Sequence, residues 1–259
     1  ASPGPTGLLV AIACCNLGES FVTNPSVDVS YSDAATGAKQ IKLLGLSGTY
    51  VQMLTENIPN YRGAAAPYGL GYVPGPWMQS IQVSKGTSSV KNGYEAITGQ
   101  INVEFKKPQL PEADWVSANL FASTTNRYEA NADATLKLSK RWSTSLLAHY
   151  ENETKAHDGN DDGFVDIPQV EQYNVWNRWA YMGDHYVFQA GIKALSETRT
   201  SGQANHGGTM HSGDLYKVGI DTERYEFFTK NAYIFNKEKN TNLALILSTT
   251  LHNQDATYG

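Results

Sequence analysis

The chain has 259 residues, a formal net charge of −5 and a charged fraction of only 17%. No basic stripe runs through the sequence, which excludes nucleic acid as a partner. No apolar run approaches the ~18 residues of a membrane-spanning helix, which excludes a helical membrane protein.

Residues 1–13 are predicted to be an irregular N-terminal segment, because Pro, Gly and Ser crowd their first half. The apolar run at residues 7–13 precedes Cys14 as in a lipoprotein signal, but the basic residues of such a signal are missing. Cys14 and Cys15 are adjacent and are the two cysteines of the sequence, so they cannot tie distant parts of the fold together. A weak helical pattern follows at Asn16–Phe21.

A glycine-punctuated hairpin is predicted in the first half of the chain. Ile81–Val83 and Gln100–Phe105 are short β-rich runs, and Gly86, Gly93 and Gly99 lie between them. The sequence contains no serine–histidine–acid order, phosphate loop or CxxC pair, so we expect no enzyme. The hairpin is therefore expected to be structural.

The composition changes at Pro108–Pro111, after which apolar and polar residues alternate. The alternation is clearest at Arg127–Ser139, where every second residue from Tyr128 to Leu138 is apolar and the residues between them are polar. A period of two residues is typical of a β-strand with one apolar and one polar face. We predict seven such strands, at Trp115–Ser123, Arg127–Ser139, Trp142–Glu151, Tyr173–Met182, Tyr186–Glu197, Glu223–Phe235 and Asn242–His252.

The connections between these strands alternate in length. Short turns near residues 139–141, 183–184 and 236–241 alternate with long loops at residues 152–172 and 198–222. Tight turns at one end and long loops at the other are typical of an outer-membrane β-barrel, whose strands cross lipid with ~9–11 tilted residues. The alternative is a soluble β-sandwich, in which strands of about 5 or 6 residues are usual. The aromatic residues expected at barrel interfaces are Trp142, Tyr173, Trp179, Tyr181, Tyr186 and Tyr233.

Four motifs follow one another in the first half of the chain. Ile41–Leu46 is similar to an I-x-x-R-G-L step, and Met53–Pro59 is similar to an L-x-D-G-x-P turn. Ile81–Gly86 is similar to an I-E-V-x-K-G strand, and Ser88–Asn102 is similar to an S-x-x-Y-G-x-x-A-I-x-G-x-I-N hairpin. In this order the motifs resemble the plug domain of TonB-dependent outer-membrane receptors, and the wider sequence resembles the Bacteroidetes branch of that family.

Two motif positions depart from the family pattern. Leu44 stands where the first motif has arginine, and Glu56–Asn57 stands where the second has Asp-Gly. The resemblance implies that the motif glycines let a compact plug turn tightly. The motif residues given a structural role are Gly45, Lys85, Gly86, Gly93, Gly99 and Asn102.

The resemblance implies a mainly β chain with two domains. An α+β plug domain at residues 14–108 is followed, at residues 109–259, by the N-terminal part of an antiparallel transmembrane β-barrel. Because family barrels have 22 strands around a plug, the seven predicted strands make the chain a fragment. The implied location is the outer membrane of a Gram-negative bacterium. The implied partners are outer-membrane lipid, a small-molecule or metal substrate, a surface lipoprotein, and the TonB complex, reached through a segment that is not in this chain.

The resemblance also implies a function, which is TonB-dependent active uptake of a scarce nutrient. The sequence narrows that nutrient no further than a metal ion or chelate, a siderophore, haem or cobalamin. The alternative is a surface binding protein, an adhesin or a passive pore that is built on a plugged barrel. Energised uptake stops when the proton-motive force is collapsed, so this treatment separates the two functions.

The first long loop contains the sequence DGNDDGFVD, whose acidic residues alternate as in the first half of an EF-hand loop. Gly163 occupies the sixth position, where the EF-hand turns sharply, whereas Gln169 occupies the twelfth, where a bidentate glutamate is usual. Oxygen ligands in this order predict a calcium site, and the alternative is a solvated acidic turn. The expected ligands are Asp158, Asn160, Asp162, the Phe164 carbonyl and Asp166.

A second group of metal ligands is suggested by soft and borderline donors. The side chains are Cys14, Cys15, His206, Met210 and His211, which suit copper or zinc. As a metal substrate site they would combine the plug with the second long loop. The interpretation we favour is a glycine-rich loop with incidental histidines and a pair of cysteines that pack without binding metal.

Overall fold

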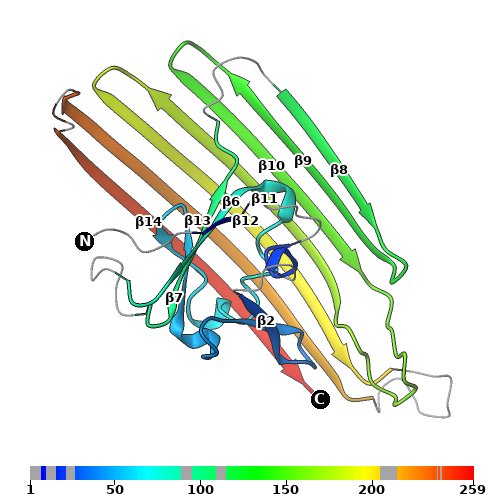
Figure 1. Cartoon of the computed structure of the whole chain (residues 1–259). Coiled ribbons are helices and arrows are strands. Elements are labelled where there is room, and N and C mark those ends of the chain that lie inside the picture. Colours follow the sequence, from blue (N-terminus) through cyan, green and yellow to red (C-terminus); the bar gives the residue numbers. More distant parts are fainter. Residues whose placement is uncertain are drawn as a thin grey trace.

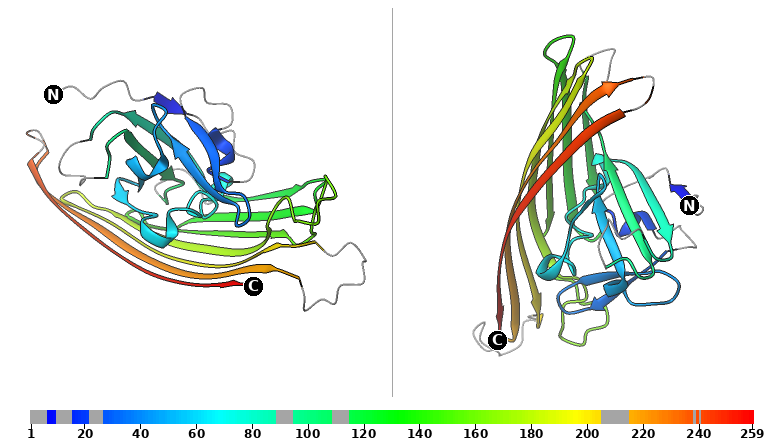
Figure 2. Two further views of the ribbon diagram at one scale, coloured as in Figure 1. Left: turned by 90° about the horizontal axis from the view of Figure 1, so that it is seen from below. Right: turned by 90° about the vertical axis from the view of Figure 1, so that its left-hand side faces the viewer.

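The computed structural model describes residues 7–9, 16–21, 27–88, 95–108, 115–204, 215–237, 239 and 241–259. A seven-stranded sheet curves around a smaller domain, which lies against its concave face (Figures 1 and 2). We call this sheet the wall and the smaller part the small domain. Within the described ranges, no helix has the length and apolar composition that a membrane crossing requires.

The small domain contains a five-stranded sheet of order β1-β6-β7-β4-β5 and a separate hairpin, β2–β3. Its strands are β1 Gly7–Leu9, β2 Asp28–Asp33, β3 Ala38–Lys42, β4 Val51–Thr55, β5 Ile58–Pro59, β6 Met78–Lys85 and β7 Gly99–Phe105. Its 3₁₀ turns in the described ranges are η1 Glu19–Phe21, η2 Gly48–Tyr50, η3 Gly63–Ala65 and η4 Gly75–Trp77. Strands β4 and β7 pair in parallel, and the other pairs are antiparallel.

The β6–β7 pair confirms the strands predicted from the glycine-punctuated sequence. Ile81 lies opposite Val103 in an antiparallel register, and both side chains are buried in the core of the small domain. Gly99 begins β7 where the two backbones approach closely, because a Cβ there would overlap the carbonyl oxygen of Ser84. This glycine therefore permits the strand pairing that the motif predicts.

The prediction of an irregular segment at residues 1–13 is wrong for Gly7–Leu9. These residues form β1, which pairs antiparallel with Ile81–Val83 of β6. The edge of β6 offers unpaired backbone groups to any neighbouring segment, and composition alone does not reveal such an edge. The weak helical pattern at Asn16–Phe21 forms only the single turn η1, because so short a helix gains too few hydrogen bonds to extend.

The wall confirms the seven strands that the alternation predicts. Each strand pairs antiparallel with its neighbours in chain order. The strands are β8 Trp115–Ala122, β9 Arg127–Lys137, β10 Trp142–Glu153, β11 Gln169–Met182, β12 Tyr186–Gly202, β13 Lys217–Asn236 and β14 Thr241–Tyr258.

Several wall strands run beyond their predicted bounds at the end that carries the long loops. The structure extends β12 to Gly202, begins β13 at Lys217 and extends β14 to Tyr258. The long loops therefore shrink to residues 154–168 and 203–216. In these extensions, largely polar residues occupy both faces of β12 and β14, so alternation does not report them. At the start of β13, the buried Val218 and Ile220 do alternate with polar residues, but over too few positions to predict a strand.

The two faces of the wall differ in chemistry. On the outer face, Val116 and Leu120 are 76% and 81% exposed. On the inner face of the neighbouring strand, Glu129, Asn131 and Asp133 are buried against the small domain. Apolar side chains facing out and polar side chains facing in are the arrangement of an outer-membrane barrel wall rather than of a soluble sandwich.

Aromatic side chains gather near the ends of the wall strands. At the end with the short turns, the ring centroids of Trp142 and Tyr181 lie 5.1 Å apart, and those of Tyr181 and Tyr186 lie 6.1 Å apart. Toward the other end, the rings of Tyr150 and Tyr173 lie 4.9 Å apart. Two such bands are expected where a wall meets the two lipid–water interfaces.

An apolar patch joins the small domain to the wall. Trp77 and Phe105 of the small domain are buried, and Phe105 meets Trp176 of β11 edge-on at 4.6 Å between ring centroids. Leu147 of β10 and Leu195 of β12 belong to the same core cluster. This patch fixes the distance between the two parts, and polar contacts surround it.

Candidate functional site

The turn between β4 and β5 presents a carboxylate to the wall. Glu56 and Asn57 both have left-handed backbone angles, with φ values of 51° and 64°. Asn57 donates its backbone N–H to Oδ1 of Asn102 at 2.7 Å, which fixes the turn to β7. The structural role of the motif residue Asn102 is therefore to hold this turn. Because Glu56 stands where the family motif has aspartate, the acidic side chain at the turn is longer.

Glu56 is buried between two cations of the wall. Its Oε1 pairs with Nη2 of Arg178 on β11, and its Oε2 lies 3.5 Å from Nζ of Lys230 on β13. Lys230 also donates to the backbone carbonyl of Glu56 at 2.7 Å. Arg178 donates a further hydrogen bond to the carbonyl of Lys106 at 2.6 Å, and its guanidinium lies 4.6 Å from the ring centre of Trp176.

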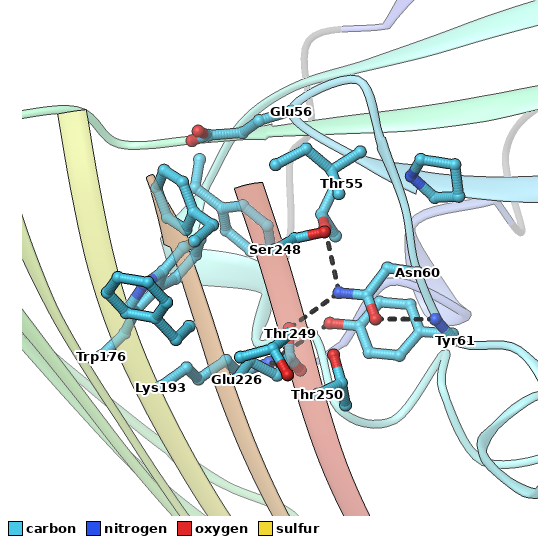
Figure 3. A pocket seen from close by; sticks show the side chains of 15 residues that line it. Thr55, Glu56, Asn60, Tyr61, Trp176, Lys193, Glu226, Ser248, Thr249 and Thr250 are labelled. Atoms are coloured by element: carbon cyan, nitrogen blue, oxygen red, sulfur yellow. Dashed lines mark hydrogen bonds and ion pairs between the residues drawn. The ribbon is translucent and has the colours of Figure 1, made fainter. Parts of the chain in front are cut away.

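A second cluster lies beside this turn (Figure 3). Asn60 donates from Nδ2 to Oε2 of Glu226 at 2.8 Å and accepts a hydrogen bond at Oδ1 from Nη2 of Arg224. Arg224 also donates from Nε to Oε1 of Glu226 at 2.7 Å. Lys193 donates to the hydroxyl of Tyr61 at 3.2 Å, so one loop of the small domain contacts both β12 and β13.

A small cavity of about 40 Å³ separates this cluster from β14. Its lining includes the hydroxyl side chains of Thr55, Ser248, Thr249 and Thr250 (Figure 3). Burial raises the pKa of Tyr61 well above its ordinary value, and the carboxylate of Glu226 raises it further. The phenol therefore stays protonated at every physiological pH.

A larger cavity of about 350 Å³ opens between the small domain and the loop-bearing ends of the wall strands, and we call it the loop-end cavity. The small domain contributes Tyr31, Lys39 and Tyr68. Arg127 and Arg199 are two of the residues that the wall contributes. The volume lies within the range of small-molecule sites, about 300–1,000 Å³.

The predicted calcium loop is held by its own acidic side chains. The carboxylate of Asp158 accepts hydrogen bonds from the backbone N–H groups of Asp162 at 3.2 Å and Gly163 at 2.8 Å. The carboxylate of Asp166 accepts a hydrogen bond from the backbone N–H of Gly159 at 2.7 Å. In the part of the chain that the structure describes, no three His, Cys, Asp or Glu side chains converge as metal ligands. The calcium site remains a prediction.

Several other predicted site residues lie outside the described ranges. They are Cys14, Cys15, Gly93, His206, Met210 and His211. Among the described motif residues, Gly45 and Gly86 have φ values of 75° and 90°, which non-glycine residues rarely adopt. Lys85 ends β6 with its side chain exposed.

The sequence of the small domain matches a known family. Residues 14–100 match the family described as TonB-dependent Receptor Plug Domain. The small domain is a TonB-dependent receptor plug. The curated proteins contain no match to the chain.

Solved receptors share this fold across plug and wall. The siderophore receptor PiuA from Acinetobacter baumannii is 12% identical in sequence and superposes with a TM-score of 0.72. The match covers 99% of this chain and 37% of the PiuA chain. The copper transporter OprC is 12% identical with a TM-score of 0.66, covering 98% and 48%. The ferric yersiniabactin uptake receptor FyuA from Yersinia pestis is 11% identical with a TM-score of 0.60, covering 98% and 50%.

The chain therefore spans half or less of the length of these receptors. It has the fold of the plug and part of the barrel of a TonB-dependent receptor. Its location is the outer membrane of a Gram-negative bacterium. We call the small domain the plug.

The buried charges between plug and wall were not predicted from the sequence. A signal does exist, because Lys193, Glu197 and Arg199 stand at even spacing on β12, on the face opposite the apolar residues. Polar residues that alternate with lipid-facing ones indicate a polar interior. What alternation cannot report is the partner of each charge, which depends on how the plug is seated.

Proposed function

We propose that the full receptor carries out TonB-dependent uptake of a scarce nutrient across the outer membrane. The substrate classes that this proposal includes are a metal ion or chelate, a siderophore, haem and cobalamin. Solved structures with this fold include a siderophore receptor and a copper transporter, which supports the proposal without choosing among these classes.

The observation that carries the proposal is the polar character of the plug–wall interface. Wall side chains donate hydrogen bonds to plug backbone carbonyls, as Lys193 does to Tyr72 at 3.1 Å and Arg199 does to Thr36 at 3.3 Å. Ion pairs such as Arg178–Glu56 surround the apolar patch at Trp176. Each hydrogen bond from such a charged donor contributes roughly 1.5–3 kcal/mol net, because water can replace either partner.

An interface of this kind suits a plug that moves. A force on the plug can exchange its polar contacts for water one by one, whereas a fully apolar interface would expose its whole area to water at about 25 cal/mol per Å². A surface binding protein or adhesin has no need for a plug that can be displaced. The interface therefore favours energised uptake over those alternatives.

The test uses cells that express the full-length receptor and a panel of labelled ferric siderophores, haem, cobalamin and copper. We expect one compound to accumulate inside the cells, and its accumulation to stop when a protonophore collapses the proton-motive force. Cells without the receptor are the control. Accumulation that survives both the protonophore and loss of TonB would show a passive pore, and binding without accumulation would show a surface binding protein.

A further inference from the structure

The loop-end cavity joins the plug to the wall at the end where the long loops lie. The β2–β3 hairpin of the plug forms one side, and it is held there by the backbone hydrogen bond from Lys39 to Pro67 at 2.9 Å. The ends of β9, β10 and β12 form the other side. A molecule bound in this cavity therefore contacts both parts of the receptor.

Arg127 cannot serve as a free cation for a ligand. Its guanidinium pairs with Glu19 at 2.7 Å, Glu129 at 2.7 Å and Glu151 at 3.0 Å. Three carboxylates therefore surround one positive charge, two of them from the wall and Glu19 from the plug, and this corner of the cavity carries an excess of negative charge. A cationic ligand group is favoured beside it.

Arg199 is also committed to partners within the protein. It pairs with Glu197 at 3.0 Å, donates to the carbonyl of Thr36 at 3.3 Å and lies 5.1 Å from the ring centre of Tyr68. Its charge is balanced, and its donors point to the protein. Arg199 therefore shapes the cavity without offering a charge to a ligand.

Lys39 differs from both arginines. Among the described residues it forms no ion pair, and its ammonium lies 5.4 Å from the ring centre of Tyr31. Burial lowers the pKa of Lys39 below its ordinary value; the carboxylate of Glu19 opposes this, while Arg127 and Arg199 add to it. A half-buried ammonium without a carboxylate partner favours an anionic ligand group.

Glu153 on the wall is the acidic counterpart of Lys39, because no cation pairs with its carboxylate in the described ranges. It is the last residue of β10, its side chain lines the cavity, and only 6% of the residue is exposed. No ion pair joins it to a cation in the described ranges, and the Thr125 side chain is its hydrogen-bonding neighbour. The guanidinium of Arg127 interacts electrostatically with Glu153, but it is already shared by three other carboxylates.

We infer that the loop-end cavity binds a zwitterionic group of the substrate, with its anionic part at Lys39 and its cationic part at Glu153. This inference rests on the proposed uptake function and narrows its substrate to molecules that carry an amino-acid-like or peptide-like group. Lys39 belongs to the plug and Glu153 to the wall, so such a group links the two parts. Tyr31 and Phe121 add aromatic surface for the apolar remainder of the ligand.

The experiment measures binding to the purified full-length receptor by isothermal titration calorimetry. The probes are the dipeptide glycyl-tyrosine, its N-acetyl derivative and its C-terminal amide, which share one dipeptide and differ in charge. We expect the zwitterion to bind about tenfold more tightly than either singly charged form, since a hydrogen bond to a charged group is worth roughly 1.5–3 kcal/mol.

Two variants test which protein side chain binds each charged group of the probe. Lys39→Met is expected to abolish the preference for the free carboxylate over the amide and to keep the preference for the free amine. Glu153→Gln is expected to do the reverse. Lys42→Met on the same strand and Glu223→Gln on the outer face of β13 are controls, because neither residue lines the cavity. Circular dichroism of each variant verifies that it is folded.

Other outcomes overturn the inference. It is wrong if no probe binds, if the three probes bind equally, or if both variants keep the full preferences of the wild type. These outcomes leave the proposed function standing, because uptake is tested separately by its dependence on the proton-motive force. Conversely, uptake that ignores the protonophore would overturn the proposed function even if the zwitterion binds as expected.

Discussion

At the scale of single residues, the position of Glu56 is the main finding. One carboxylate at the tip of a two-residue turn meets an arginine of β11 and a lysine of β13. Burying a charge is costly unless it is paired, so each of the three side chains depends on the others. Glu56 therefore fixes the orientation of the plug, and its loss leaves a buried arginine and a half-buried lysine without their acid.

Glu56→Gln is expected to weaken the seating of the plug by about 3–5 kcal/mol, the usual cost of breaking a buried pair from one side. The measurement is the urea concentration at which the plug becomes sensitive to protease in the full-length receptor. Glu95→Gln is the matched control, because the Arg62–Glu95 pair is exposed and such pairs contribute about 0–1 kcal/mol. Equal shifts in the two variants would contradict a special role for Glu56.

Glu104 gives a prediction about pH. Burial by itself would raise its pKa, but hydrogen bonds from Lys107 and Asn102 outweigh burial and hold the pKa below the ordinary 4.5. The carboxylate therefore contributes stability above its unfolded-state pKa, and this contribution is lost as the pH falls through the lower, folded-state pKa.

Urea unfolding of the plug at a series of pH values is the measurement for Glu104. The wild type is expected to be more stable than Glu104→Gln at neutral pH. The difference is expected to shrink as the pH falls through the acidic range. A difference that stays constant down to the lowest pH would mean that Glu104 does not contribute through its charge.

The acidic loop at residues 154–168 tests the predicted calcium site. The double variant Asp158→Ala and Asp162→Ala removes two of the expected calcium ligands. If calcium orders the loop of the wild type, the variant is expected to be cleaved more readily near residues 155–170, and only when calcium is present. Limited proteolysis with and without calcium measures this, and identical cleavage in all four samples would leave the loop an acidic turn.

At the scale of elements, the sequence predicted strands better than it predicted their ends. Alternation locates all seven wall strands because lipid and the plug demand opposite chemistry on their two faces. It misses the outer extensions of β12 and β14, where both faces are largely polar, and that of β13, where only Val218 and Ile220 alternate. Backbone pairing with neighbouring strands specifies the strands there. Strand β1 was missed for a related reason, since it exists only because β6 has an edge to pair with.

The β6–β7 pair gives a prediction at this scale. Gly99→Ala places a Cβ against the carbonyl oxygen of Ser84 and a methyl group of Leu43, so the strands must move apart. Overpacking of this kind costs typically 1–3 kcal/mol. Urea unfolding of the plug measures the loss, and Gly219→Ala on the wall, where a Cβ meets open space, is expected to have little effect.

At the scale of the whole molecule, plug and wall are held by different interactions. The wall strands are joined along their whole length by backbone hydrogen bonds, which lipid protects. The plug is held to the wall by one apolar patch and by side-chain contacts that water can replace. The two parts are therefore expected to separate before the wall unfolds.

Hydrogen exchange of the full-length receptor in increasing urea tests this order. Amides of β4 and β7 in the plug are expected to exchange at urea concentrations at which amides of β10 to β12 remain protected. Glu56→Gln is expected to widen the gap between the two transitions. A single transition shared by plug and wall would show that the interface does not open independently.

The sequence by itself determined the class of the protein and the course of its strands. Residue alternation and four short motifs are local patterns, and each is the direct result of what a strand face or a tight turn requires. The partners of the buried charges were decided by the tertiary structure alone. Glu56 and Arg178 are far apart in the chain, and so are Lys39 and Glu153. Only the seating of the plug in the curved wall determines which charges are paired and which face the loop-end cavity without an ion-pair partner among the described residues.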